Sequence, residues 1–366
     1  MSESEKANFV GQLIREIAQD IGARHAGPPW LLGFTSGLDS RLLYYALSGV
    51  GVPLELYTFG QTGNADYDFA KLASKKLDVP IRLFDTTELN WTLGEFDQLT
   101  PQVRDKPVSP RLKVASTLTA ERGKYTEVHG FLNDHITGSS VPKKPSKSWN
   151  EAVDFFCESN DQFGFQSHAD RKMLRSLLPA RPFESELDYD RQLDLGYRQM
   201  QRIRPTDHLG VSYVCPFLDQ RWAGFWLNRT HHELRKQRLY VKALLGLGAD
   251  VFFDLNALAA EKLPIRKKQR QEFLYGPNLK QRQVKADKKA IPLSAGSHFC
   301  FFSCYCNNKS FKSFVDESVM RISKRRVFRQ AFLDDVFQKF LAGDRAAEKM
   351  VKGVVSIDIG IEGNLF

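Results

Sequence analysis

Apolar residues follow alternating helical and strand-like patterns along the first quarter of the chain. Between Phe9 and Ile21 they recur at three- and four-residue steps, which predicts an amphipathic helix that ends before the Gly-Pro-Pro break at 27–29. Short continuous apolar runs, typical of buried parallel strands, then alternate with helical patterns. These runs and patterns lie at 30–34, 41–47, 54–59, 66–77 and 81–84. Strand and helix alternating at this spacing predict an α/β fold with a parallel twisted sheet flanked by helices.

Beyond the first quarter, the chain is expected to hold one more strand and then to be mainly helical. The strand is predicted at 125–128, where it leads into His129 and Gly130. From 150 to 245 the pattern is helical, apart from an irregular link at 211–219. After residue 260 the helical periodicity of the apolar residues weakens.

The composition excludes several classes of protein. The 366 residues are 42 % hydrophobic and 12 % aromatic, which is enough for a folded core and excludes a disordered or fibrous chain. No stretch approaches the roughly 18 to 20 apolar residues that a membrane helix needs. The acidic N-terminus lacks the pattern of a signal peptide, and five cysteines do not suit a disulfide framework. We therefore expect a cytoplasmic protein without a membrane span.

The positive charge is concentrated in one segment. The net charge is +9, yet residues 261–330 alone hold 17 Lys and Arg against 5 Asp and Glu. A basic zone of this kind suits an anionic partner such as nucleotide phosphates, an anionic substrate or RNA. A solvated basic face with no specific ligand is an equal alternative.

The turn between the first predicted strand and the next helix has the sequence Thr35-Ser36-Gly37-Leu38-Asp39-Ser40. Backbone N–H groups in such a turn, together with the positive end of the helix, can hold phosphate. The turn has neither the Walker A nor the GxGxxG spacing, and an acidic residue beside phosphates requires a divalent cation between them. Asp39 is therefore predicted to be a Mg²⁺ ligand. The alternative is an ordinary turn in which Asp39 and Ser40 cap the helix.

The segment TSGLDS at 35–40 resembles the SGGxDS loop of the PP-loop ATP pyrophosphatases, which share the adenine nucleotide α-hydrolase-like fold. Three later segments resemble the asparagine synthetase branch of that family. GFLNDHITG at 130–138 is similar to GxGxDExxxG, residues 216–219 reproduce PFLD, and 263–273 resemble LP…RxK…F. The four segments occur in the family's order, over roughly residues 30–275.

The resemblance implies ATP and Mg²⁺ as cofactors. The nucleotide-binding positions would be Thr35, Ser36, Gly37, Leu38, Asp39, Ser40, Thr58, Phe59, Gly60 and Gly130. Asp39 and Asp134 would hold Mg²⁺ from the ends of two strands. Lys268, with Lys267 as the alternative, would neutralise negative charge that develops during adenylation and amide formation.

The resemblance also predicts the domains, and the chain departs from it at several positions. We expect an N-terminal helix at 1–28, a PP-loop ATP pyrophosphatase domain at 29–255, and a basic C-terminal region at 256–366 that completes the active site. His135 replaces the acidic residue of the second motif, and Phe131 replaces the tyrosine of β-lactam synthetases. No glutaminase domain with an N-terminal cysteine is expected, so ammonia or an amine would come from solution, from a carrier or from a separate glutaminase subunit.

These features predict an ATP-dependent ligase. It would adenylate a small or carrier-borne carboxylate, release pyrophosphate, and transfer the acyl group to ammonia or an amine to form an amide. One alternative is a PP-loop enzyme that adenylates a base in tRNA, which the basic zone favours. Another is a degenerate nucleotide-binding module, which the altered loop and His135 favour.

Four soft-ligand residues, His298, Cys300, Cys304 and Cys306, lie within nine positions. A zinc site usually draws its ligands from two separated pairs. The aromatic residues between them instead predict a buried strand whose thiols pack as small apolar groups.

Overall fold

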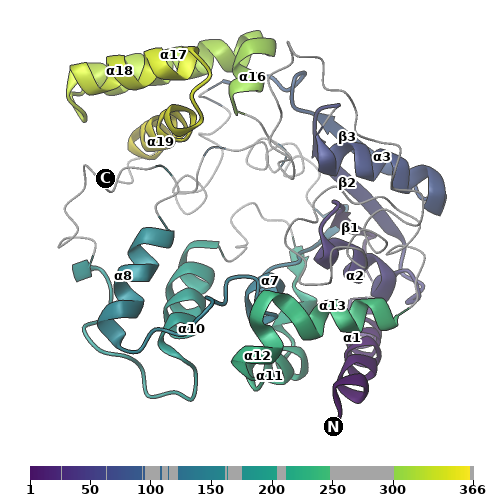
Figure 1. Ribbon diagram of the computed structural model, residues 1–366. Helices are drawn as coiled ribbons and strands as arrows, with labels where there is room; N and C mark the ends of the chain where they lie inside the picture. The colour runs from purple at the N-terminus through teal and green to yellow at the C-terminus, as the bar shows by residue number, and fades with distance from the viewer. Residues whose placement is uncertain are drawn as a thin grey trace, which may run out of the picture.

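Five parallel strands form one sheet at the centre of the fold (Figure 1). The computed structural model describes residues 1–92, 123–160, 175–203, 212–247 and 301–362, apart from positions 26 and 63. It also describes the single positions 94, 108, 114 and 163. The strand order is β3-β2-β1-β4-β5. The strands are β1 Trp30–Gly33, β2 Leu54–Gly60, β3 Ile81–Asp85, β4 Thr126–Val128 and β5 Ser212–Val214. The predicted α/β fold with a parallel sheet is confirmed. The prediction of an irregular link at 211–219 was wrong at residues 212–214, which form the edge strand β5.

Helices flank the sheet and make up the C-terminal part, as predicted. The first three are α1 Glu3–Arg24, α2 Leu38–Leu47 and α3 Ala65–Leu77. The middle of the chain holds α7 Asn133–Ile136, α8 Trp149–Ser159, α10 Tyr189–Leu193, the π-helix η1 Asp194–Ile203, the 3₁₀ turns η3 Pro216–Leu218 and η4 Arg235–Gln237, α11 Gln220–Leu227, α12 His231–Leu234 and α13 Arg238–Gly246. The C-terminal helices are α16 Phe301–Asn307, α17 Lys309–Lys324, α18 Gln330–Leu341 and α19 Arg345–Glu362. Among these described segments, no helix has the length and hydropathy needed to cross a membrane.

The main core lies on one face of the sheet. Successive side chains of a strand point to opposite faces. Trp30 and Leu32 of β1 accordingly belong to the main core, whereas Leu31 packs with Tyr57 in a smaller cluster on the other face. The predicted apolar stripe of α1 packs into the main core together with α2, α11 and α13. The N-terminal helix is therefore part of the core that supports the sheet.

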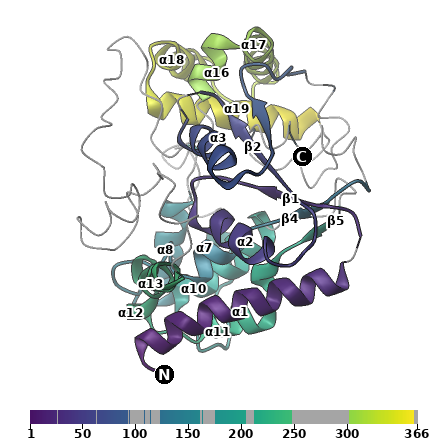
Figure 2. The ribbon, with the colours of Figure 1, turned by 90° about the vertical axis from the view of Figure 1, so that its right-hand side faces the viewer.

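The C-terminal helices contact the segments after β2 and β3 through α16 and through Asn308, the N-cap of α17. Asn308 is 5 % exposed, and its side-chain NH₂ group donates to the carbonyl oxygens of Thr86, Thr87 and Leu89. Gln61, directly after β2, donates to Ser303 Oγ at 3.0 Å. Figures 1 and 2 show the C-terminal helices on the opposite side of the sheet from α1.

The strand predicted around the cysteines was wrong. Residues 301–307 form a helix in which the aromatic side chains pack against α17 and α18, Cys304 is buried and Cys306 is exposed. A short apolar run does not distinguish a buried strand from one face of a short helix. His298 and Cys300 lie outside the described residues.

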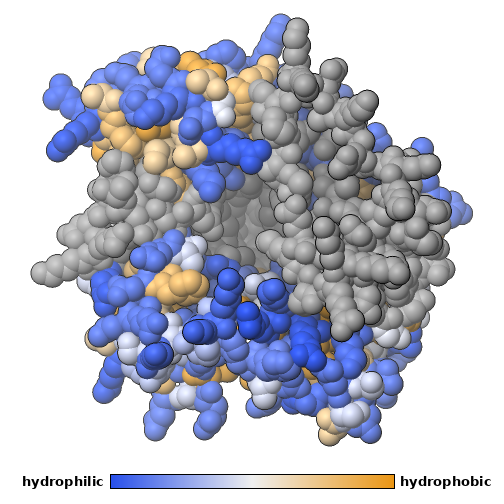
Figure 3. Space-filling view, in the orientation of Figure 1, coloured by the Kyte–Doolittle hydropathy of each residue, from blue (hydrophilic) through white to orange (hydrophobic). Residues whose placement is uncertain are grey.

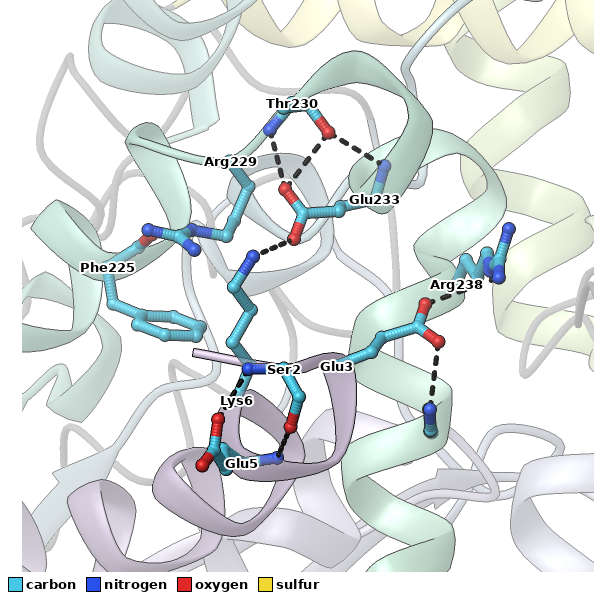
Figure 4. A network of polar contacts seen from close by, with 10 residues as sticks. Ser2, Glu3, Glu5, Lys6, Phe225, Arg229, Thr230, Glu233 and Arg238 are labelled. Atoms are coloured by element: carbon cyan, nitrogen blue, oxygen red, sulfur yellow. Dashed lines mark hydrogen bonds and ion pairs between the residues drawn. The ribbon is translucent and has the colours of Figure 1, made fainter.

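The N-terminus of α1 is joined to α12 by a polar network (Figure 4). Lys6 donates to Glu233 Oε1 at 2.6 Å, and Glu233 also closes a capping box with Thr230. Burial alone would raise the pKa of Glu233, but the hydrogen bonds from Lys6 and Thr230 outweigh it and lower that pKa to about 2. A second contact, between Lys242 and Glu3, joins α1 to α13.

Glu233→Gln should destabilise the protein by about 1–2 kcal/mol at pH 7, because it removes a charge-assisted pair that is mostly shielded from water. A carboxylate with a depressed pKa stabilises the fold above its unfolded pKa and loses that effect as the pH falls toward its folded pKa. The difference between wild type and variant should therefore shrink from about pH 4.5 to pH 2. Denaturant unfolding across this range measures it. The exposed Glu184→Gln is the control and should leave the free energy of unfolding unchanged at every pH.

Candidate functional site

The strand order reverses between β1 and β4. From β1 the chain adds β2 and β3 on one side, and then returns to place β4 and β5 on the other side. Ligands of open parallel sheets bind at such a switch point, outside the carboxyl ends of the strands. The turn after β1 carries residues 35–40, and the segment after β4 carries Gly130 and Asp134. Two segments that the sequence predicted to share a site therefore meet at this point.

The turn after β1 is held by its own side chains. Thr35 N–H donates to Ser40 Oγ at 3.1 Å, and Gly37 N–H donates to Thr35 Oγ1 at 3.2 Å. Gly37 is the N-cap of α2, and because it has no side chain it accepts no hydrogen bond from the first turn of the helix. Asp39 and Ser40 thus do not cap the helix as the alternative reading of the sequence required. The uncapped N–H groups and the helix dipole favour an anion at this end of α2.

Ser36 is tied to the first turn of α3. Its N–H and its hydroxyl both donate to Asp66 Oδ1, at 2.8 and 2.5 Å, and both residues are buried. Arg41, which is fully buried, stacks over Phe69 at 4.6 Å, and none of its guanidinium nitrogens has a hydrogen-bond partner in the part of the chain that the structure describes. Burial lowers the pKa of Arg41 to about 9, and the negative charge of Asp66 opposes that change. Ser36 therefore does not offer its donors to a ligand in this conformation.

Asp39 lies at the centre of the switch point. Its Oδ1 accepts hydrogen bonds from Asn133 at 2.6 Å and from the Tyr240 hydroxyl at 2.7 Å. Burial and repulsion from Asp134 raise the pKa of Asp39 to about 8. Burial and the charge of Asp39 raise the pKa of Tyr240, which keeps the phenol protonated as a donor. Two carboxylates that repel each other in this way favour a cation between or beside them.

Backbone and amide contacts hold the segment after β4 against Asp39. A Cβ added to Gly130 would lie 3.7 Å from Asp39 Cβ, so the two residues are close neighbours. Asn133 is fully buried and accepts from the indole N–H of Trp222 at 2.8 Å. Because an indole N–H can only donate, this bond fixes the orientation of the Asn133 amide and directs its NH₂ group to Asp39. Gln237 donates to Asp134 at 3.2 Å.

The donor set fits a Mg²⁺ ion that is shared with a ligand. Mg²⁺ prefers oxygen ligands and usually binds one or two carboxylates together with phosphate oxygens and water. Asp39 and Asp134 supply two carboxylates, of which Asp134 is exposed. Within the described residues, no group of three or more His, Cys, Asp or Glu side chains could hold a metal by itself. The remaining ligands would have to come from phosphate and water.

The other segment predicted to bind the nucleotide, residues 58–60, lies beside this centre. Thr58, Phe59 and Gly60 end β2, which is the neighbour of β1. Thr58 is buried, and Phe59 packs with the smaller cluster on the second face of the sheet. Gly60 accepts from the N–H of Thr86 at 2.7 Å. The Phe59 ring is therefore taken up by that cluster, and the Gly60 carbonyl by the residue that follows β3.

His135, the residue that departs from the family motif, joins a second charged cluster. Its Nδ1 lies 2.8 Å from Asp194 Oδ2, and Arg198 contacts the other oxygen of Asp194 at 2.9 Å. Ser140 also donates to Asp194, at 3.0 Å. Burial would raise the pKa of Asp194, but His135 and Arg198 outweigh it and lower that pKa.

Two predicted residues lie outside the described part of the chain, and three residues of the site were not predicted. Lys267 and Lys268 lie outside the described residues, as does most of the basic zone. Asn133, Trp222 and Tyr240 were not predicted, because they reach Asp39 from distant parts of the chain. Asn133 alone carried a signal, since it directly precedes Asp134 in the second motif.

No family model matches the chain, and no curated protein matches it significantly. The likeness to the asparagine synthetase branch therefore rests on the four sequence segments, and the geometry around Asp39 is independent of it.

Proposed function

We propose that the protein is an ATP-dependent ligase that forms an amide through an acyl-adenylate, as in the asparagine synthetase-like branch of the PP-loop ATP pyrophosphatases. The observation that carries the proposal is the pairing of Asp39 and Asp134 at the switch point, next to the uncapped N-terminus of α2. Paired carboxylates beside a phosphate-binding helix end suit a nucleotide that binds with Mg²⁺. A cytoplasmic location is part of the proposal.

Each residue would have a distinct role. The backbone N–H groups of residues 38–40, at the start of α2, would bind the pyrophosphate portion of ATP. Asp39 and Asp134 would hold Mg²⁺, which would neutralise phosphate charge when bound. Asn133 and Tyr240 orient the Asp39 carboxylate through their hydrogen bonds. Lys268 or Lys267 would offset the charge that develops on the attacked carboxyl group. Placement of the carboxylate against the α-phosphate would supply much of the rate enhancement.

A screen for pyrophosphate release tests this function. The purified protein is incubated with ATP, Mg²⁺, a panel of carboxylic acids, and either ammonium or simple amines. We expect release only when a carboxylate is present, with loss of release in Asp39→Ala and Lys268→Ala. RNA that co-purifies with the protein, and whose binding weakens steeply with salt, would favour the tRNA-modifying alternative instead.

One observation favours the non-catalytic alternative, a degenerate nucleotide-binding module. Ser36 gives both of its donors to Asp66, so this part of the loop does not reach a ligand. Under that alternative ATP binds without pyrophosphate release for any acid. Equilibrium binding of ATP alongside the screen distinguishes the two functions.

A further inference from the structure

A cavity lies between α8, α10, η1 and residues 140–142, and Asp194 in its wall contacts His135 of the candidate site. Its volume is about 220 Å³. Sites for drug-sized ligands usually span roughly 300–1,000 Å³, so this cavity suits a smaller molecule. One wall is the π-helix η1, a rare form that often occurs at functional sites.

Apolar side chains form much of the cavity wall. Val141, Ala152, Phe155 and Phe156 all line it. Phe155 is 43 % exposed, and Figure 3 shows an apolar patch among hydrophilic side chains over α8 and α10. A ligand of this cavity would therefore carry an apolar group.

The charged residues that line the cavity balance one another. Among the described residues they are Asp190, Arg191, Asp194 and Arg198, two of each sign. Asp190 accepts from Ser146 N–H at 2.7 Å and from the Ser146 hydroxyl at 2.6 Å. Asp194 is paired with His135 and Arg198, as described above. Equal numbers of opposite charges suit a zwitterion better than a free anion or cation.

Arg191 is the least satisfied member of this set. It is 9 % exposed, and among the described residues its Nε has no hydrogen-bond partner and its Nη2 reaches only the Leu227 carbonyl, at 3.4 Å. Burial lowers the pKa of Arg191, and the charge of Asp188 opposes that change. A buried guanidinium without full pairing is costly, and a carboxylate can accept two parallel hydrogen bonds from it.

We propose that this cavity binds an α-amino acid with a short apolar side chain. Its carboxylate pairs with Arg191, its ammonium group lies toward Asp194, and its side chain contacts Val141, Ala152 and Phe156. Asp194 contacts His135, which is adjacent in sequence to the candidate Mg²⁺ ligand Asp134. The ammonium end is therefore the end nearer to the candidate catalytic centre.

This inference rests on the proposed function and names its nitrogen donor. The amino group, after losing one proton, attacks the carbonyl carbon of the acyl-adenylate. A C–N bond forms, the C–O bond to AMP breaks, and AMP leaves with the bonding pair. The nitrogen then loses its second proton, and both protons pass to water. The product is an N-acylated amino acid.

Calorimetric binding of L-leucine to the full chain, without ATP, tests the site. We expect saturable binding that Arg191→Met weakens by roughly ten- to a hundredfold, because a charge-assisted pair is lost. The exposed Arg181→Met is the matched control and should bind L-leucine like the wild type. 4-Methylpentanoate, which lacks the amine, and isoamylamine, which lacks the carboxylate, should each bind at least about tenfold more weakly.

A second variant guards against misfolding of Arg191→Met. Ser159→Phe fills the cavity from a position that lines it and is exposed, so it should abolish L-leucine binding in protein that melts like the wild type. No binding of L-leucine, valine or isoleucine, or equal binding by wild type and Ser159→Phe, would overturn the proposal. Because the assay contains no ATP, this failure is separate from a failure of pyrophosphate release.

Discussion

Asp39→Asn is expected to reduce pyrophosphate release by about 10²–10³-fold. The change is isosteric, and the Asn133 and Tyr240 donors can still bond to the remaining oxygen. Only the negative charge that would hold Mg²⁺ is lost, and one precisely placed electrostatic contact in an active site is worth about this much. Initial rates with saturating ATP, at several Mg²⁺ concentrations, measure the effect.

The stability of the same variant separates a catalytic role from a structural one. Burial and the charge of Asp134 both disfavour the Asp39 carboxylate, so removal of that charge should leave the melting temperature unchanged or higher. Asp335→Asn is the matched control. It removes a carboxylate whose ion pair, with Lys339, lies on the exposed surface of α18, and it should change neither rate nor stability. Full activity in Asp39→Asn would exclude Asp39 from the reaction.

Gly138→Ala is expected to destabilise the protein by about 3 kcal/mol or more. Gly138 has φ +104°, and an added Cβ would lie 2.1 Å from the carbonyl oxygen of Leu234. Both the backbone conformation and the contact with another backbone oppose any side chain. Because Gly138 ends the segment that holds Asp134, pyrophosphate release should fall together with the free energy of unfolding. Denaturant titration with parallel rate measurements checks this.

A second glycine provides a control with the opposite sign. Gly224 lies within α11, and an added Cβ would meet nothing within 4 Å. Gly224→Ala should stabilise the protein by about 0.5–1 kcal/mol, because alanine restricts the unfolded chain and favours helix. Equal effects of the two substitutions would show that the close packing at Gly138 does not matter for stability.

The elements of the fold that follow a clear periodicity were predicted from the sequence. The apolar runs at β1, β2 and β3 and the helical stripes between them each depend on local pattern, so their bounds agree with the structure within a few residues. β5 was missed because three residues are too few to show a period. Helix α16 was mistaken for a strand, since its burial depends on packing against α17 and α18.

The candidate site was predictable only in part. Asp39 and Asp134 follow predicted strands, and parallel strands bring their carboxyl ends to one edge. The groups that orient Asp39 are Asn133, Trp222 and Tyr240, and their contacts span 89 to 201 positions of the sequence. The hydrogen bond that Asp66 accepts from Ser36 was likewise not predicted. Such pairings depend on how helices pack on the sheet, which local patterns do not encode.

Exchange of labelled pyrophosphate into ATP tests the central claim most directly, because it requires adenylation and no nitrogen donor. We predict exchange that depends on Mg²⁺ and on one class of carboxylic acid, and that is lost in Asp39→Asn but retained in Asp335→Asn. Folded protein that shows no exchange with any acid, or exchange that Asp39→Asn leaves unchanged, would contradict the assignment of this site to carboxylate adenylation.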